Sequence, residues 1–430
     1  MIDQRGLIWE PGLWGSTPKW TIEPSLKAVA EAVYHHLELS SADIADSSIE
    51  VFNQGGFNKL YSITCPRGVY IARVTLPVDP VYKTASEVAT LHMISRYTSI
   101  PVPTVYGYDL SRANPIGFEW MLMNHMPGIT LDKAWPGMSW SAKYRLIHRM
   151  TDVLSQLFHR TKSNGIGNIY HFADSRVLEA SRMLVNEMSP AYLLGQVVSM
   201  GFFWDKHIVQ DIPRGPFLTS QQWLRSRLLL TQSDANAVLA NSCDEDELED
   251  AEVTRDLVSR LTECIPRYFP SEVQDGGSLV CCMHHDDLSW HNILVDQKNG
   301  SLVGIVDWEC VQFVPIWKAC RIPDFLQSPP RSEEPKYSSY QHNDDGTPGE
   351  GYIRHQREYE STVLRTVFLE RMAQVDPSWI KLYEASGEKL DLCFCVESCD
   401  NSLCFEIIRK WLDNQAAGGE YYSLLNEAMQ

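Results

Sequence analysis

The sequence predicts an α+β protein with two lobes, a small β-rich lobe followed by a larger and mostly helical one. Two patterns carry the prediction. Short runs of β-branched and aromatic residues, bounded by turn residues, fill the stretch 48–124. Apolar residues then recur at helical spacing from about residue 139 onward. A chain of 430 residues is long enough for two such units, and we place their boundary between 1–124 and 125–430.

The β-rich lobe is expected to contain four strands and two helices. Residues 1–46 form a tryptophan-rich arm that ends in a helix. The strands are predicted at Ser48–Phe52, Leu60–Thr64, Val69–Thr75 and Phe118–Asn124. Apolar residues at helical spacing predict a second helix over 84–97.

The second lobe is expected to be mostly helical. The region 170–275 lacks strong strand signals, and the acidic run 244–252 is typical of a solvated helix face. Residues 327–352 are rich in proline, serine, glycine and charge, which predicts a mobile surface loop. The stretch 353–428 is again predicted to be helical.

Composition narrows the classes of partner. The net charge of −18 opposes a nucleic acid or an anionic membrane as the main partner. Near the N-terminus no apolar run is long enough for a signal peptide or a membrane span, so we expect a cytoplasmic protein, with mitochondria left open. The eleven cysteines are then expected to be reduced and mostly buried, and their spacing does not favour zinc.

The residues best suited to chemistry lie in the run His285-Asp286-Asp287-Leu288-Ser289-Trp290-His291-Asn292 and at Asp307. Two short strands are predicted at 293–295 and 302–306, with Asn299-Gly300, a strong hairpin signal, midway between Asn292 and Asp307. A simple hairpin places those two residues opposite each other, with Cα atoms about 4.5–5.5 Å apart. Such a pair of oxygen donors suits Mg²⁺.

Asp287 lies in the turn before the first of these strands, where a carboxylate can accept a proton from an incoming hydroxyl. Taken singly, Asp287, Asn292 and Asp307 are also ordinary turn residues, and Asp307 could simply cap Trp308. Their joint spacing matches the catalytic-loop pattern H-x-D-L-x-x-x-N of kinases. His285 is expected to brace the loop, and Asp286 either assists Asp287 or faces solvent.

With these residues the chain resembles the aminoglycoside phosphotransferase / choline kinase-like family, and most closely its fungal branch. Members share the protein-kinase architecture and phosphorylate small molecules. The segments that carry the resemblance follow the family's order over roughly residues 50–330. They are 56–59, 70–73, 86–89, 100–103, 214–217, 285–289, 306–309 and 315–317.

The resemblance implies a bilobal protein-kinase-like fold that uses ATP and Mg²⁺. It implies that Asp287 is the catalytic base and that Asn292 and Asp307 are metal ligands. The remaining nucleotide contacts that it implies are a phosphate-covering loop with Gly55, Gly56, Phe57 and Asn58, an adenine cover at Ile71, and a hinge with Asn124 and Met126. On residue pattern alone, Gly55-Gly56 is equally well explained as a plain hairpin turn.

One position departs from the kinase pattern, because Arg73 stands where kinases place lysine. Arginine is also permanently charged and can bind phosphate oxygens with two donors. Glu87 is the expected partner of Arg73, although Thr84-Ala85-Ser86-Glu87 also reads as a capping box. Arg73 could equally be a surface cation on an edge strand. No Asp-Phe-Gly or Ala-Pro-Glu segment follows Asp307, which argues against a protein kinase.

The function expected from the sequence is therefore an ATP- and Mg²⁺-dependent phosphotransferase acting on a hydroxyl of a small molecule. The alternative is a catalytically weak binding or scaffold protein that retains the fold, with Arg73 as its main support. A third reading keeps ATP but changes the chemistry to acyl activation or nucleotidyl transfer. The partner expected is a hydroxylated acceptor, cationic or polyol, bound largely by region 170–275, and no nucleic acid, membrane or protein substrate.

Overall fold

A five-stranded antiparallel sheet forms the centre of the N-terminal lobe in the computed structural model, which describes residues 2–12, 15–174, 183–184, 191–270, 279–418 and 423–424. The strand order is β3-β4-β5-β7-β6. The strands are β3 (Ser48–Gln54), β4 (Asn58–Cys65), β5 (Gly68–Thr75), β6 (Val105–Asp109) and β7 (Glu119–Asn124). The four predicted strands are confirmed to within two residues at each end, and β6 is additional.

The two faces of this sheet contact different parts of the molecule. Tyr70, Ala72 and Val74 of β5 pack with Val29 and Val33 of α1 (Leu26–His36) in one apolar cluster. Successive side chains on a strand point to opposite faces, so the intervening residues of β5 point toward α3 (Tyr82–Tyr97) and the second lobe. Helix α3 begins two residues earlier than predicted.

The N-terminal arm contains more structure than expected. A hairpin of β1 (Leu7–Glu10) and β2 (Thr17–Trp20) precedes α1, and α2 (Ser41–Ala45) follows it. The prediction of an arm with one helix was wrong about the hairpin. Its strands have four residues each, one of them containing Pro18, and are too short for a periodicity signal.

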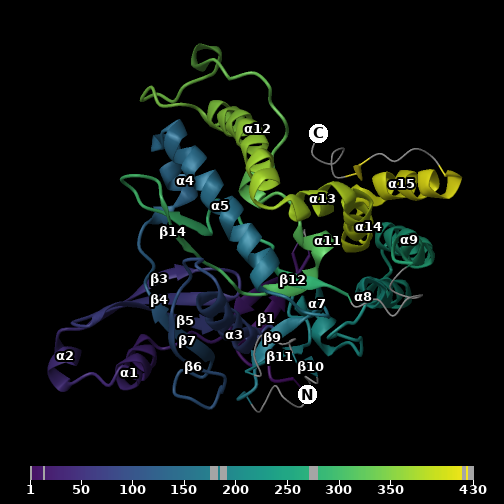
Figure 1. Ribbon diagram of the computed structural model, residues 1–430. Coiled ribbons are helices and arrows are strands. Elements are labelled where there is room, and N and C mark those ends of the chain that lie inside the picture. Colours follow the sequence, from purple (N-terminus) through teal and green to yellow (C-terminus); the bar gives the residue numbers. More distant parts are fainter. Residues whose placement is uncertain are drawn as a thin grey trace.

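Helices dominate the second lobe (Figure 1). They are α4 (Leu131–Ala134), α5 (Trp140–Arg160), α7 (Met200–Phe203), α8 (Ser220–Asn241), α9 (Glu245–Tyr268), α11 (Ile316–Ala319), α12 (Glu350–Val375), α13 (Pro377–Ala385), α14 (Gly387–Ser398) and α15 (Phe405–Ala417). Single 3-10 turns lie at Trp135–Gly137, His207–Val209, Asp324–Leu326, Tyr337–Ser339 and Ser402–Cys404. Helix α12 packs beside α5, and α8 and α9 form an antiparallel pair (Figure 1).

Three small sheets lie within or at the edge of this helical lobe. They are β9 (Asn168–His171), β10 (Met183–Leu184) and β11 (Tyr192–Gly195); β12 (Cys281–His284) with β15 (Gln312–Pro315); and β8 (Ile129–Thr130), β13 (Ile293–Val295) and β14 (Leu302–Ile305). Region 170–275, in which the sequence shows no strong strand signal, nevertheless contains β10, β11 and the end of β9. In the third sheet, β8 pairs with β13, so the segment that leaves β7 is fixed directly to the hairpin of the predicted site.

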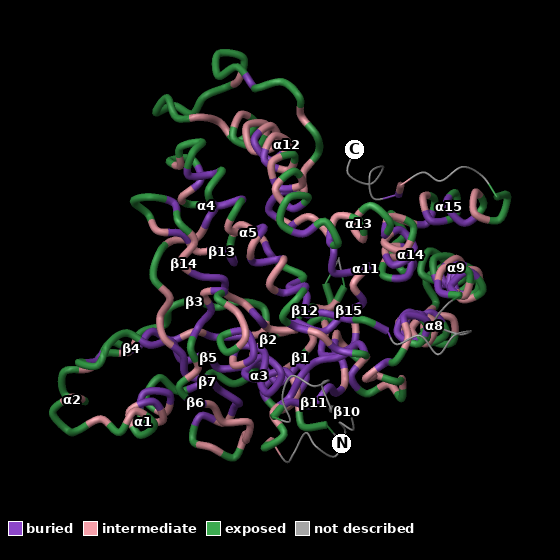
Figure 2. Tube along the Cα trace, in the orientation of Figure 1, coloured by how far each residue is buried: buried purple, intermediate pink, exposed green. Residues whose placement is uncertain are grey.

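Burial follows this arrangement (Figure 2). The largest apolar cluster joins α3 to the helices of the second lobe, and a smaller one joins Leu76, Val78 and Ala85 to Tyr170 and Phe203 across the two lobes. The two lobes therefore share buried apolar surface. The boundary placed at residue 124 stays a prediction.

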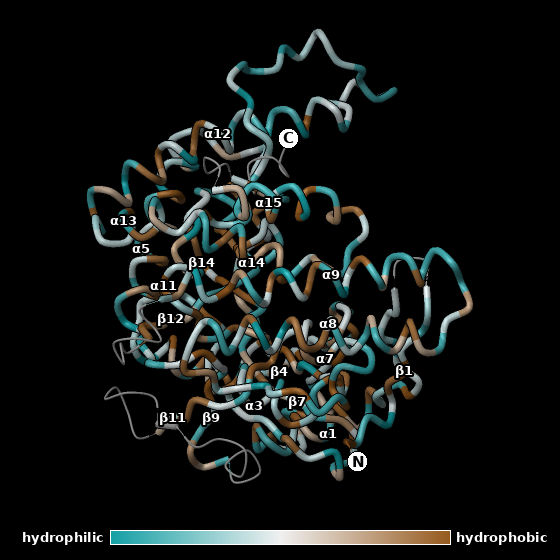
Figure 3. The backbone as a smooth tube through the Cα atoms, turned by 90° about the vertical axis from the view of Figure 1, so that its right-hand side faces the viewer, coloured by the Kyte–Doolittle hydropathy of each residue, from teal (hydrophilic) through white to brown (hydrophobic). Residues whose placement is uncertain are grey.

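Surface features agree with their predicted character. Residues 327–349 are irregular, mostly exposed and largely hydrophilic (Figures 2 and 3). Their mobility stays a prediction. The acidic residues of 244–252 are exposed at the start of α9, and all eleven cysteines are free thiols, most of them buried. In the part of the chain that is described, no helix is long and apolar enough to cross a membrane.

Candidate active site

His285 fastens the loop between β12 and β13 to the end of β14. Its ring is 2% exposed; Nε2 lies 3.2 Å from the carbonyl oxygen of Val306, and Nδ1 lies 3.3 Å from the backbone nitrogen of Asp287. Burial lowers the pKa of His285, so a neutral ring donates from Nε2 and accepts at Nδ1. The expected bracing role agrees with this geometry.

Asp287 and Asn292 form a hydrogen-bonded pair within the loop. The Asn292 amide donates to Asp287 Oδ2 at 2.7 Å and to the Asp287 carbonyl at 3.0 Å. The Asp287 side chain is exposed, whereas Asn292 is buried. The amide therefore orients the carboxylate and leaves its second oxygen available to accept a proton.

The predicted register of the hairpin was wrong by one residue. Ile293 pairs with Ile305, and the Asn292 carbonyl accepts a hydrogen bond from Val306 N at 2.9 Å, so Asn292 lies opposite Val306 and not Asp307. A bulge between Leu294 and Val295 shifts the register. The turn is also wider than a two-residue loop, because Gly300 N donates to the Asp296 carbonyl at 2.8 Å.

Asp307 reaches the site through an unusual backbone conformation. Its φ of 63° is left-handed, which aspartate tolerates better than most residues with a Cβ. Its Oδ1 accepts a hydrogen bond from Arg73 Nη2 at 3.1 Å, and no helix begins at Trp308. The interpretation of Asp307 as a simple cap is therefore wrong.

The oxygen atoms near the loop fit a magnesium ion shared with a nucleotide. Among the described residues, no donor contacts Asn292 Oδ1 or Asp307 Oδ2, and Asp307 is 40% exposed. No group of three His, Cys, Asp or Glu side chains in this part of the chain could hold a metal alone. Mg²⁺ commonly takes one or two protein ligands together with substrate phosphates and water, so these two oxygen donors fit its usual coordination.

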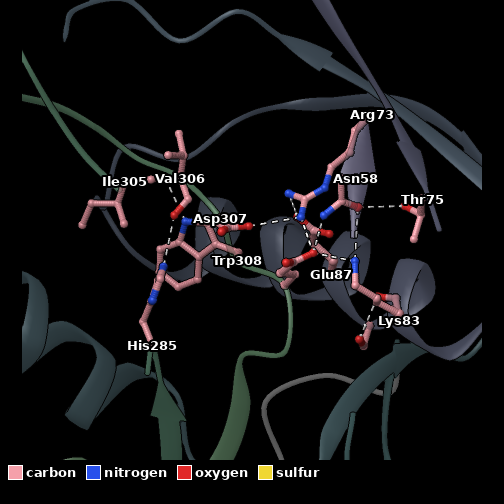
Figure 4. A network of polar contacts seen from close by, with 12 residues as sticks. Asn58, Arg73, Thr75, Lys83, Glu87, His285, Ile305, Val306, Asp307 and Trp308 are labelled. Carbon is pink, nitrogen blue, oxygen red and sulfur yellow. Dashed lines mark hydrogen bonds and ion pairs between the residues drawn. The ribbon is translucent and has the colours of Figure 1, made fainter. Parts of the chain in front are cut away.

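Arg73 is the centre of a buried ion cluster (Figure 4). It is 5% exposed; Nη1 contacts Glu87 Oε1 at 2.7 Å, and Nη2 contacts both Asp307 and Glu309. The predicted pair of Arg73 and Glu87 is confirmed. The capping-box alternative is wrong because α3 begins at Tyr82, and the surface alternative is wrong because β5 lies between β4 and β7.

Lys83 is a member of this cluster that the sequence reasoning missed. It is fully buried, and its Nζ lies 2.5 Å from Glu309 Oε2 and 3.2 Å from Asn58 Oδ1 (Figure 4). Its position four residues before Glu87 places both side chains on one helix face, a signal that could have found it. The ion cluster therefore contains a lysine, but it is Lys83 of α3 and does not come from β5.

Two carboxylates of the cluster follow closely in sequence, at Asp307 and Glu309. Burial raises the pKa of Glu309, but the charges of Lys83 and Arg73 outweigh it and leave that pKa at about 2. Glu309 is therefore ionised, whereas burial raises the pKa of Glu87 to about 7 despite the charge of Arg73. The cluster thus joins two basic side chains to three acidic ones. Asn58 bridges Lys83 and Glu309, because its Oδ1 accepts a hydrogen bond from Lys83 and its Nδ2 donates to Glu309 Oε2 at 2.7 Å.

The predicted phosphate-covering loop connects β3 to β4 above this cluster. A Cβ added to Gly55 or Gly56 would meet no atom within 4 Å, and neither residue has a positive φ. The protein itself therefore does not require glycine at these positions. Phe57 packs edge-on against Phe203 at 5.3 Å, which anchors the loop to the second lobe.

The predicted adenine side is fixed to both lobes. Ile71 is buried beside Met123 on β7. The Asn124 side chain accepts a hydrogen bond from Thr104 N at 2.7 Å. A Cβ added to Gly304 would come within 2.8 Å of the Met126 methyl group, so Met126 lies against β14.

The sequence model of the phosphotransferase enzyme family matches residues 48–317, more than half of the chain. A subtelomeric hrmA-associated cluster protein of Aspergillus fumigatus is 24% identical over 318 residues, which cover 65% of this chain and 61% of that protein. Altered inheritance of mitochondria protein 9, mitochondrial, of Lachancea thermotolerans is 25% identical over 263 residues, 54% of this chain and 42% of that protein. The chain thus matches less than two thirds of these relatives' length.

Solved structures of aminoglycoside phosphotransferases are also similar, at low identity. The gentamicin complex of APH(2'')-IIa matches 89% of this chain and 98% of its own, at 13% identity and a TM-score of 0.41. The structure of APH(4)-Ia matches 90% of this chain and 99% of its own, at 12% identity and a TM-score of 0.41.

Proposed function

The chain belongs to the phosphotransferase enzyme family, and we propose that it transfers the terminal phosphoryl group of ATP to a hydroxyl of a small molecule. The observation that carries the proposal is that two arrangements meet at one loop. These are the Asn292–Asp287 hydrogen bond at 2.7 Å and the buried contacts from Asp307 through Arg73 to Glu87. Phosphoryl transfer needs a positioned hydroxyl and a neutralised phosphate, and the two arrangements supply one each.

In this proposal Asp287 is the catalytic base. Asn292 fixes one oxygen of its carboxylate, and the other accepts the proton of the acceptor hydroxyl as the oxygen attacks phosphorus. Asn292 Oδ1 and Asp307 Oδ2 would hold Mg²⁺, which when bound neutralises charge on the phosphates. Arg73, held by Glu87, would hold Asp307 in place beside the same phosphates and approach them with its guanidinium.

The remaining nucleotide contacts follow the lobe boundary. Gly55, Gly56 and Phe57 would cover the phosphates with backbone N–H groups, because the open space beside both glycines permits a close approach. The Asn58 side chain would hold the ion cluster in place through its hydrogen bonds to Glu309 and Lys83. The adenine would lie against Ile71, with Asn124 and Met126 at the hinge.

The pairing of Arg73 with Glu87 supports the enzyme over the scaffold alternative, because active kinase-like sites contain the corresponding ion pair. A cytoplasmic location stays a prediction. The relatives named as mitochondrial support mitochondria as the other compartment.

The proposal is tested by incubating the protein with ATP, Mg²⁺ and separate pools of hydroxylated metabolites. We expect ADP to form with at least one pool, together with a product that is heavier by one phosphoryl group in mass spectrometry. Binding of ATP without ADP formation in any pool would contradict the proposal and favour a non-catalytic binding protein.

A further inference from the structure

A cavity of about 610 Å³ lies next to the predicted catalytic loop, between α12 and the segment that follows the 3-10 turn at 324–326. Its wall includes Trp290 of the loop, Phe325, and the N-terminal part of α12 from Glu350 to Ser361. This volume is in the range of small-molecule binding sites. Neither the ion cluster around Arg73 nor Asp287 lines the cavity, so the cavity is a separate compartment beside the same loop.

The residues that form the cavity wall are close to Asp287 along the chain or are hydrogen-bonded to its loop. Trp290 lies three residues after Asp287, which limits the separation of their Cα atoms to about 11 Å. Leu288 N donates to Asp324 Oδ2 at 3.0 Å, and Phe325 N donates to the Leu288 carbonyl at 3.1 Å. A molecule in the cavity can therefore extend a hydroxyl toward Asp287 while its other end stays against Trp290.

The aromatic wall of the cavity is rigid. The Trp290 ring meets Trp135 edge-on at a centroid distance of 4.7 Å and Phe325 edge-on at 5.7 Å. The Arg357 guanidinium lies over the Trp290 ring, 5.2 Å from its centroid. Two packed aromatic neighbours fix the ring, and the ring in turn fixes the position of the guanidinium.

Charge pairing in the wall is uneven. Glu358 is matched twice, by Arg331 Nε at 3.0 Å and by Arg354 Nε at 3.8 Å. Arg357 is half-buried, yet no carboxylate of the described residues lies within 4 Å of it. Its hydrogen bond is a long one, 3.5 Å to the carbonyl oxygen of Asp132. Arg357 is therefore a positioned cation whose charge the protein leaves unmatched.

We propose that this cavity binds the acceptor and that Arg357 binds an oxyanion of it, a carboxylate or a phosphate. Arginine presents paired donors that match either group. The inference rests on the proposed function, since it takes the molecule in the cavity to be the one phosphorylated. It replaces the expected cationic or polyol acceptor, bound by region 170–275, with a hydroxylated anion bound by α12 and the catalytic loop.

The competing explanation is that Arg357 only covers the Trp290 ring. Two variants separate the explanations. Arg357→Gln removes the charge and leaves a planar, polar amide on a shorter side chain. Arg371→Gln removes a half-buried arginine farther along α12, outside the cavity, and serves as the matched control.

The experiment is ligand-observed NMR with four pools of small molecules: hydroxylated carboxylates, sugar phosphates, amino alcohols and uncharged polyols. We expect binding from one of the two anionic pools, and which one binds identifies the oxyanion. Arg357→Gln should weaken that binding on the order of tenfold to a hundredfold, as for a lost charged hydrogen bond. Arg371→Gln should leave it unchanged.

Binding by the amino alcohols or polyols alone, no binding by either anionic pool, or unchanged anion binding in Arg357→Gln would overturn the inference. The measurement needs no turnover, so it is independent of the proposed chemistry. Anion binding that depends on Arg357 but never leads to ADP formation would contradict the proposed function and leave the anion site standing.

Discussion

Two groups of basic side chains flank the catalytic loop, and they differ in whether the protein pairs them with carboxylates. In the ion cluster of Arg73, Lys83, Glu87, Asp307 and Glu309, each cation meets at least one carboxylate within 3.1 Å. In the cavity beside α12, Arg357 meets none among the described residues. The first region is closed by the protein itself, whereas the second leaves a charge for a partner from outside.

This difference distinguishes positioning from recognition. A closed network fixes Arg73 and Asp307 in place before any ligand arrives, and removing one member leaves a buried charge unpaired. An open cation costs the fold little and gains its partner only when a ligand binds. The loop 285–292 joins the two regions, because His285 is fastened to Val306 on one side and Leu288 to Asp324 on the other.

The largest effect is expected at Asp287, which lies between the two regions. Asp287→Asn keeps the side-chain shape but cannot accept the hydroxyl proton. We expect phosphoryl transfer to fall about 10²–10⁴-fold, with ATP affinity and anion binding unchanged, in steady-state kinetics and NMR titration. Unchanged turnover in this variant would remove Asp287 from the role of base.

The closed region is tested by Glu309→Gln, which leaves Lys83 and Arg73 short of one carboxylate. Breaking a buried ion pair in this way is expected to lower the free energy of unfolding by about 3–5 kcal/mol. The matched control is Glu358→Gln beside the open cavity, where Arg354 is exposed and Arg331 is half-buried, and the expected cost is about 1 kcal/mol or less. Equal losses in urea unfolding would mean that the two regions do not differ as described.

A pH effect is expected at the edge of the closed region. Burial raises the pKa of Glu119 to about 7, and its Oε1 accepts a hydrogen bond at 2.6 Å from Val81 N, just before α3. Between about pH 4.5 and 7 the folded protein then retains a proton that the unfolded chain has lost. The stability contributed by this group therefore falls as pH rises through that window, by about 3 kcal/mol in total, and is constant above it.

Urea unfolding at pH 5 and pH 8 measures this effect, with Glu119→Gln as the control that cannot titrate. Wild type should lose more stability than the variant between the two pH values. The same pH dependence in both proteins would show that Glu119 does not hold the extra proton.

The smallest effect is expected in the phosphate-covering loop. A Cβ at position 56 meets nothing in the free protein, so Gly56→Ala should change the free energy of unfolding by no more than about 0.5 kcal/mol. Because the methyl group would stand between backbone and phosphate, we expect the KM for ATP to rise several-fold. A large loss of stability with normal ATP kinetics would instead assign the glycine to the fold.

Local patterns predicted much of the sheet and of the loop. Runs of β-branched and aromatic residues located β3, β4, β5 and β7, and Asn299-Gly300 between two short apolar runs located the hairpin. These patterns could not supply the register, because no residue signal marks the bulge between Leu294 and Val295. The residue pattern also could not predict the role of Arg357. This residue comes 67 positions after Trp290 in the sequence, and only the packing of α12 brings the two side chains together.

We propose that Asp307 joins Mg²⁺ and ATP in one site, and calorimetric titration of ATP with and without Mg²⁺ measures this coupling. The informative variant is Asp307→Asn, because asparagine tolerates the left-handed backbone while lacking the charge. We predict that wild type binds ATP much more tightly with Mg²⁺ and that the variant loses this difference. Equal ATP affinity with and without Mg²⁺ in wild type, or no ATP binding at all, would contradict the account.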